Sequence, residues 1–282
     1  MLKAAAFLGL VLALGAPPPP PPLVRYTLAE ARRSLTPHGE RSRAVSGTVT
    51  LLGEKARWDL SGGDVFPRAQ ANGAVTDGRT LLLVDSRERR YARLGPEELD
   101  QLFAAPPAAP SGADVSPVST AATVTEEGAG KPLGELPTRR YRVTLKTESR
   151  VTATGRVTTL VSETHGTIES VDLPPSPFDG LLRLFTVRGD ARDALQRELG
   201  KVEGLPVRVS LETVSETRAE TVGDASSPER PRSFQTKSSA TRTVSDLTRR
   251  VSAKQDPALF QVPDDFRLLG PERLLAQDSV LP

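Results

Sequence analysis

The sequence contains no cysteine among its 282 residues. This absence excludes disulfides, thiolate metal sites, a cysteine nucleophile and a lipid-modified N-terminal cysteine. Histidine is almost absent as well: His38 and His165 are far apart, and neither stands at ligand spacing from a second histidine or a set of acids. We interpret His38 as an exposed turn residue and His165 as a structural strand residue, and we expect no metal and no other cofactor.

Catalytic motifs are also missing. No glycine-rich phosphate loop precedes a helix, and neither GxSxG nor HExxH occurs. The acids form adjacent pairs, Glu97 with Glu98, Glu126 with Glu127 and Asp264 with Asp265, for which capping and solvation are better explanations than acid–base work. The sequence therefore predicts a protein that is not an enzyme.

Charge of one sign is not in excess, because the net charge is only +2. Of the 37 basic residues 30 are arginine, and they are spread among nearly as many acids. Nucleic-acid grooves need clustered positive charge with stacking aromatics, and aromatic residues make up only 4% of this chain. We interpret the arginines as solvated strand faces and expect no nucleic-acid partner.

The N-terminus resembles a secretory signal peptide over residues 1–16. Lys3 precedes an apolar run from Ala4 to Leu14, and the small residues Gly15 and Ala16 favour cleavage after one of them. The run is too short to span a bilayer as a helix, so we expect no transmembrane span after its removal; an uncleaved anchor is the alternative. Six prolines at residues 17–22 form a polyproline spacer. The protein is thus expected to be periplasmic or secreted.

The stretch from Val45 to Leu94 organises the fold. Its first part alternates apolar and polar residues, turns at Gly53-Glu54 and resumes alternation with Ala56, Trp58 and Leu60 on one side, which predicts a β-hairpin. Asp77-Gly78 predicts a second turn before an apolar strand from Leu81 to Val84.

Further strands are expected on both sides of that stretch. Leu23 to Leu35 fits a strand or a helix face, and we favour a strand that pairs with the first hairpin. The Ala-, Pro- and Ser-rich segment from Ala104 to Lys131 predicts a disordered loop, either a flap or an inert insertion. The later alternating segments are Leu136–Val151, Val157–Leu173 (with a bulge or bend at Gly166), Leu205–Val222 and Ser233–Val251.

Three segments have helical spacing: Gly95–Phe103, Phe178–Phe185 and Asp190–Val202, the last with Gly204 after its end. A closing segment, Ala258 to Leu268, supplies Phe260, Val262 and Phe266 to the edge of the core. The helices cannot alternate with the strands as βαβ units. We therefore expect a mainly β (α+β) protein with one curved antiparallel sheet and two or three short helices against its concave side. One domain is predicted over residues 23–270, followed by a tail at 271–282.

Several short motifs resemble the LolA/LolB-like superfamily of periplasmic lipoprotein carriers. They are the basic-aromatic step of Lys55, Arg57 and Trp58, then the DG-x-x-L-x-x-x-D hairpin from Asp77 to Asp85, and the closing LF-x-VP segment from Leu259 to Pro263. The resemblance implies a half-open β-barrel covered by helices, with an apolar cavity for acyl chains. The predicted loop and the polar late strands depart from that pattern.

Two functions are compatible with this pattern. The first is a carrier that binds a lipid acyl chain or a lipoprotein, with Val49, Leu51, Trp58 and Leu60 as the candidate apolar lining. The second is an envelope module that binds a protein partner and has a filled core. In the second case the same four residues are core, and Trp58 is more typical of a core residue than of a ligand contact.

Overall fold

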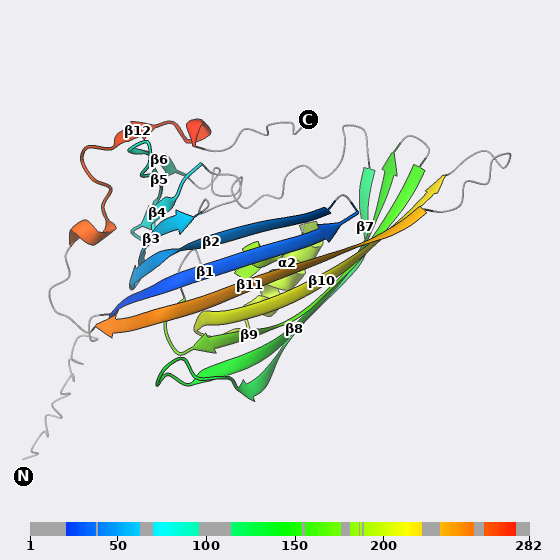
Figure 1. Cartoon of the computed structure of the whole chain (residues 1–282), viewed down its shortest axis with the longest axis horizontal. Coiled ribbons are helices and arrows are strands. Elements are labelled where there is room, and N and C mark those ends of the chain that lie inside the picture. Colours follow the sequence, from blue (N-terminus) through cyan, green and yellow to red (C-terminus); the bar gives the residue numbers. More distant parts are fainter. Residues whose placement is uncertain are drawn as a thin grey trace, which may run out of the picture.

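Figure 1 shows the computed structural model of the chain. The residues described are 21–37, 39–62, 70–95, 114–153, 156–175, 181–185, 187, 189–221, 232–250 and 257–274. The predicted signal peptide and all but the end of the proline run, together with His38, lie outside these residues. So does the predicted helix at 95–103, apart from Gly95.

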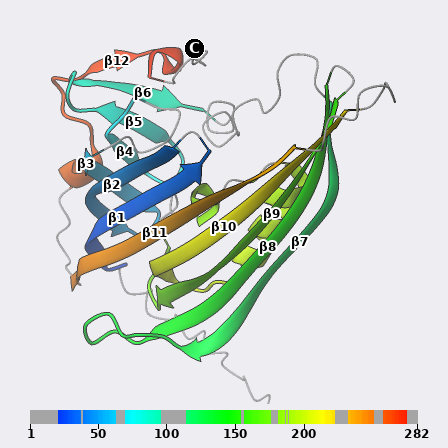
Figure 2. The ribbon, with the colours of Figure 1, turned by 45° about the vertical axis from the view of Figure 1, so that its right-hand side comes forward.

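In the described part of the chain, twelve strands form a single sheet in the order β12-β6-β5-β4-β3-β2-β1-β11-β10-β9-β8-β7. Their bounds are β1 Leu23–Thr36, β2 Gly39–Leu52, β3 Lys55–Gly62, β4 Gly73–Thr76, β5 Leu81–Asp85, β6 Arg90–Leu94, β7 Asp114–Ala129, β8 Thr138–Ala153, β9 Arg156–Val171, β10 Leu205–Thr221, β11 Arg232–Arg250 and β12 Arg267–Leu269. All neighbours are antiparallel except β12, which runs parallel to β6. The edges, β12 and β7, do not meet, so the sheet is curved but not closed into a barrel (Figure 2).

The hairpins around the organising stretch are confirmed. Gly53 turns the chain between β2 and β3 with φ +57°, and Gly78 turns it between β4 and β5 with φ +91°. The Asp77 carboxylate accepts hydrogen bonds from the backbone N–H groups of Arg79 and Thr80, and these bonds lower the pKa of Asp77. The segment from Leu23 to Leu35, for which the sequence allowed a strand or a helix, lies in the strand β1. This strand pairs with β2, as predicted.

The predicted loop at 104–131 is wrong for its second half, because residues 114–129 form the strand β7. The segment is rich in small polar residues, which favour loops in isolation. Tertiary pairing overrides this preference, since β7 bonds along its length to β8 and turns Val124 into the core. Irregularities in the pairing near Pro117 and at Gly128 leave the strand edge uneven, as expected at the edge of a sheet.

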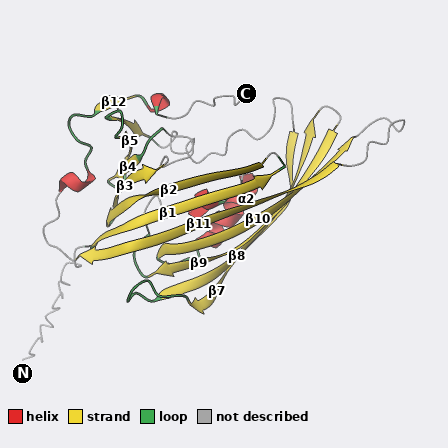
Figure 3. Cartoon of the chain, in the orientation of Figure 1, coloured by secondary structure: helices red, strands yellow, loops and turns green. Residues whose placement is uncertain are grey.

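One α-helix, α2 Gly189–Leu199, and three 3₁₀ helices occur in the described part (Figure 3). The 3₁₀ helices are η1 Leu181–Leu184, η2 Pro257–Phe260 and η3 Pro271–Arg273. The predicted helix at 190–202 is confirmed except for its last turn. The predicted helix at 178–185 is present only as η1 in its described part. Among the described helices none has the length and apolar composition that a membrane span requires.

Two clusters of buried residues fill the interior on one face of the sheet, here called the inner face. The N-terminal cluster lies over β1–β6 and extends to Val171, Val207 and Val244 of β9–β11, and it includes the fully buried Leu274 after η3. The predicted tail therefore begins later than residue 271. The second cluster packs η1 and α2, through Leu184, Leu195 and Leu199, against β7–β10 and Ala240 of β11.

Two glycines allow neighbouring strands to approach closely at the inner face. A Cβ on Gly166 of β9 would lie 2.1 Å from the carbonyl oxygen of Ser210, and one on Gly47 of β2 would lie 2.3 Å from that of Asp59. The pairing of Gly166 is continuous with Val143 on β8 and with Leu211 on β10, so the bulge considered there is absent. The close approach of β9 to β10, rather than an extra residue in a bulge, explains why a glycine stands at position 166.

Candidate functional site

Strand pairing arranges the inner-face residues into rows that cross the sheet, because directly opposite residues of antiparallel strands share one face. One row, here called the apolar row, joins Val143, Gly166, Leu211 and Ala240 across β8–β11. The row then continues through Arg32 of β1 to Arg43 of β2. The side chains of this row are therefore apolar on β8–β11 and cationic on β1 and β2.

Hydroxyl side chains form the next two rows toward the strand tips, here called the hydroxyl rows. The first holds Thr164, Thr213, Ser238 and Ser34, and the second holds Thr147, Ser162, Ser215 and Thr236. Thr164 and Thr213 are hydrogen bonded through their Oγ1 atoms at 2.8 Å, and Ser162 and Ser215 through their Oγ atoms at 2.9 Å. The inner face therefore changes from apolar to polar along the strands.

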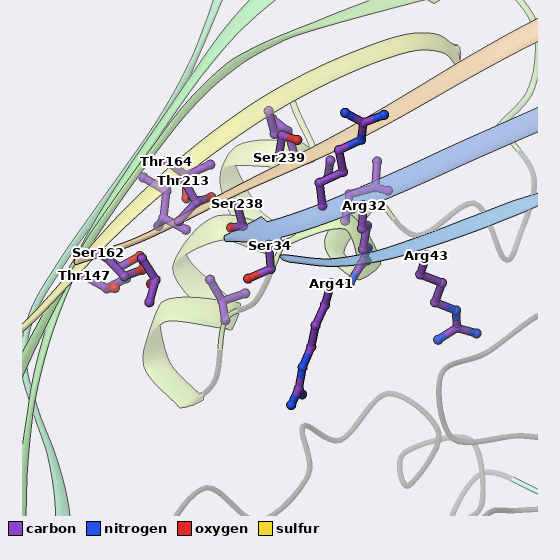
Figure 4. Close-up of a pocket in the computed structure, with 18 of the residues that line it drawn as sticks. Arg32, Ser34, Arg41, Arg43, Thr147, Ser162, Thr164, Thr213, Ser238 and Ser239 are labelled. Atoms are coloured by element: carbon purple, nitrogen blue, oxygen red, sulfur yellow. Dashed lines mark hydrogen bonds between the residues drawn. The ribbon is translucent and has the colours of Figure 1, made fainter. Parts of the chain in front are cut away.

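A pocket of about 450 Å³ lies over these rows (Figure 4). Its apolar lining comes from Leu145, Leu160, Leu184, Val187, Leu211 and Ala240. Its polar lining comes from the hydroxyl rows and from Arg32, Arg33, Arg41 and Arg43. In Figure 4 the hydroxyls of Thr147, Ser162, Thr164 and Thr213 gather on one side, and Arg41 and Arg43 extend from the β1–β2 hairpin on the other.

A buried ion pair bounds the pocket on the side of the N-terminal cluster. The Nε of Arg242 lies 2.8 Å from Oε1 of Glu30, and the side chains are 0% and 10% exposed. The pair lies between Ala240, which belongs to the second cluster, and Val244, which belongs to the first. The ion pair therefore separates the two clusters. Removal of either side chain would leave the other as an uncompensated buried charge.

No protein-family model and no curated protein matches this chain.

The four candidate lining residues are brought together, but in the N-terminal cluster. Val49 and Trp58 pair across β2 and β3 and are 0% exposed, while Leu51 and Leu60 are also buried. None of the four lines the 450 Å³ pocket. Leu60 also lines a second, smaller pocket of about 280 Å³. The choice between core and ligand lining for these four residues therefore stays a prediction.

Arg57, from the basic-aromatic motif next to these residues, contacts the closing segment. Arg57 donates hydrogen bonds from Nη1 to the carbonyl oxygens of Leu259 and Gln261, at 3.4 and 3.2 Å, and from Nε to Asp59. The smaller pocket of about 280 Å³ lies beside this contact, with Pro263 and Phe266 in its lining. The basic residue of the predicted step thus binds the closing segment, in which Phe260, Val262 and Phe266 are half-buried.

No set of three metal-ligating side chains occurs in the described residues. His165 is exposed on the outer face, with Nε2 3.9 Å from Oε2 of Glu163. Lys146 hydrogen bonds the same carboxylate at 2.6 Å and lowers the pKa of Glu163. One member of each described acidic pair forms an ion pair, since Glu127 contacts Arg140 and Arg142 while Asp265 contacts Arg89.

The pocket arginines are candidate site residues that the sequence pattern did not single out. Arg32 is half-buried, whereas Arg41 and Arg43 are exposed at the pocket mouth. The spacing of Arg41 and Arg43 by two residues places both on one face of a strand, which is a usable signal. The contribution of Arg32 depends on the β1–β2 register, which brings it opposite Arg43.

Proposed function

We propose that the protein is a non-catalytic exported carrier that holds the acyl chain of a lipid or lipoprotein in a pocket between the sheet and its helices. In this proposal the curved sheet acts as the half-open barrel of a LolA/LolB-like carrier. The supporting observation is the 450 Å³ pocket on the inner face, beside Leu184 of η1 and Val187. Its size falls in the range of small-molecule sites.

The lining supports an acyl guest. Leu184 of η1 and Val187 face the pocket from the helical side, while Leu145, Leu211 and Ala240 face it from the sheet. A curved sheet that does not close needs its apolar inner face covered, either by its own helices or by a hydrophobic guest. Here the helices cover the second cluster, and the pocket extends beyond them.

Lipid analysis of the native protein tests this proposal. The protein is purified from its own cell envelope without detergent exchange, and bound lipid is measured by native mass spectrometry and by extraction. Ala240→Phe fills the pocket floor and is expected to lower bound lipid several-fold. Thr241→Phe, on the exposed outer face of the same strand, is the matched control and is expected to leave it unchanged.

Absence of lipid in the native protein, together with no binding of added decanoate, would contradict the carrier proposal. Export is tested separately by N-terminal sequencing of the mature protein. A chain that begins after residue 15 or 16 agrees with the predicted cleavage, and a secreted chain that begins at Met1 contradicts it.

An envelope interaction module is the second candidate. It is favoured by the filled N-terminal cluster around Trp58 and by β7, a 16-residue strand at the edge of the sheet. Crosslinking in cells that recovers one specific partner, from a protein that carries no lipid, would favour this candidate over the carrier.

A further inference from the structure

The two faces of the long strands differ in their charges. The outer face mixes both signs, as in the Lys146–Glu163 pair at 2.6 Å and the Arg218–Glu216 pair at 2.8 Å. The described residues that line the inner-face pocket include four arginines and no carboxylate. Because the net charge of the whole chain is only +2, this excess is local to the pocket.

The β1–β2 pairing concentrates this charge. Arg32 stands directly opposite Arg43, and Arg41 stands opposite Ser34, one position nearer the strand tips. Guanidinium groups present paired N–H donors that match the oxygens of carboxylate and phosphate.

The hydroxyl rows add neutral donors on the other side of the pocket. The Ser162–Ser215 pair contains two O–H groups and one hydrogen bond between them, and the same holds for Thr164 and Thr213. One O–H in each pair therefore remains to donate to a further acceptor. An anionic group at the mouth would thus face guanidinium donors from β1 and β2 and hydroxyl donors from β8–β11.

The apolar lining lies deeper, at Leu184, Leu211 and Ala240. We propose that the pocket binds an anionic amphiphile, whose carboxylate or phosphate head contacts Arg32, Arg41 and Arg43 and whose hydrocarbon chain lies on Leu184, Leu211 and Ala240. This inference rests on the proposed carrier function and specifies its ligand class. The head is held at the mouth, and the chain is shielded between sheet and helices.

Three ligands with the same ten-carbon chain and different heads distinguish the contribution of the head to binding from that of the chain. Delipidated full-length protein is titrated calorimetrically with decanoate, decyl phosphate and 1-decanol at low salt, and inorganic phosphate is titrated alone. The two anionic ligands are expected to bind at least about tenfold more tightly than decanol, as expected for a charge-assisted contact to the head. Inorganic phosphate is expected to bind far more weakly than decyl phosphate, because it lacks the chain.

Arg41→Gln combined with Arg43→Gln removes two exposed charges from the mouth. The preference for anionic ligands is expected to fall to about threefold or less, while decanol affinity stays the same. Arg25→Gln combined with Arg150→Gln makes the same charge change at exposed positions outside the pocket lining and is expected to leave the preference intact. Circular dichroism confirms that both variants fold before titration.

Salt provides a second measurement. Raising the ionic strength from about 0.05 M to about 0.5 M shortens the screening length and is expected to reduce the preference of the wild-type protein for anionic heads. Equal affinity for all three ten-carbon ligands overturns the head-group inference and leaves the carrier proposal standing. Failure of all three to bind overturns the carrier proposal itself. Inorganic phosphate that binds as tightly as decyl phosphate overturns the amphiphile and indicates a free-anion site.

Discussion

The carboxylate of Glu198 on α2 accepts a hydrogen bond of 2.9 Å from the backbone N–H of Val124 on β7. Because β7 is an edge strand, this N–H has a helix side chain as its partner instead of another strand. The same carboxylate contacts Nζ of Lys201 at 2.7 Å. The helix that covers the inner face is therefore fastened to the free edge of the sheet.

Glu198→Ala is expected to loosen this attachment. The Val124 N–H loses its partner, so the melting temperature should fall by about 2–4 °C, as expected when one hydrogen bond is lost in a domain of this size. Differential scanning calorimetry measures the change. Gln196→Ala, on the exposed side of the same helix, is the control and should melt like the wild-type protein.

The same contact predicts a pH dependence. The hydrogen bond that Lys201 donates, followed by the one that the Val124 N–H donates, lowers the pKa of Glu198 below its ordinary value of 4.5. Stabilisation by a carboxylate of lowered pKa is complete above the unfolded-state pKa and is lost as the pH falls through the folded-state pKa. The stability difference between the wild-type protein and Glu198→Gln should thus be present at pH 7 and shrink below pH 4.5. A difference that stays constant down to pH 3 would contradict this.

Trp58 is expected to stabilise the protein without contacting ligand. Trp58→Ala removes a fully buried side chain and should lower the free energy of unfolding by about 3–5 kcal/mol, measured by urea titration. Trp58→Phe should retain the fold and the affinity for decanoate. A large loss of that affinity in a stable Trp58→Phe protein would instead indicate that this core contacts the ligand.

Gly166→Ala tests the close approach of β9 and β10. A Cβ at this position would overlap the carbonyl oxygen of Ser210, so the strands must separate, at a cost of about 1–3 kcal/mol in unfolding free energy. Thr167→Ala, one residue along the same strand, is expected to cost less than about 1 kcal/mol. Equal effects of the two substitutions would show that the approach is not constrained.

Arg57→Ala should release the closing segment. The backbone carbonyls of Leu259 and Gln261 would lose the guanidinium that binds them, and chymotrypsin should cut near Phe260 faster than in the wild-type protein. Lys55→Ala, two residues earlier on β3, is the control. Unchanged cleavage in Arg57→Ala would mean that other contacts hold the segment.

Local signals were sufficient for much of the fold. Gly53 and Gly78 adopt the positive φ that their turns require, and the alternation around Trp58 identified the buried face correctly. These features depend on residues that are close in sequence. The strand β7 was missed because the Ala, Pro, Ser and Gly residues in and around it indicate a loop, although its Val and Thr residues favour a strand; the pairing with β8 decides its conformation.

The candidate site was predicted less well, for a related reason. The apolar residues around Val49 are visible as a pattern, but the pattern does not say whether a neighbour or a ligand covers them. The pocket depends on which strands meet: Arg32 becomes a pocket residue because β1 pairs with both β2 and β11. Such long-range register is not encoded in local periodicity.

The pairing of β1 with β11 also has a consequence for folding. Glu30 and Arg242, the buried ion pair, are 212 positions apart in the chain, so β1 acquires its second neighbour only when most of the chain has been synthesised. Non-local pairings of this kind slow folding, because the connecting chain must be closed before the contacts form. We expect the hairpins on each side to form early and the joining of β1 to β11 to be the slow final step. A chain truncated before Arg232 would leave β1 and β10 as two exposed edges and would be prone to aggregation.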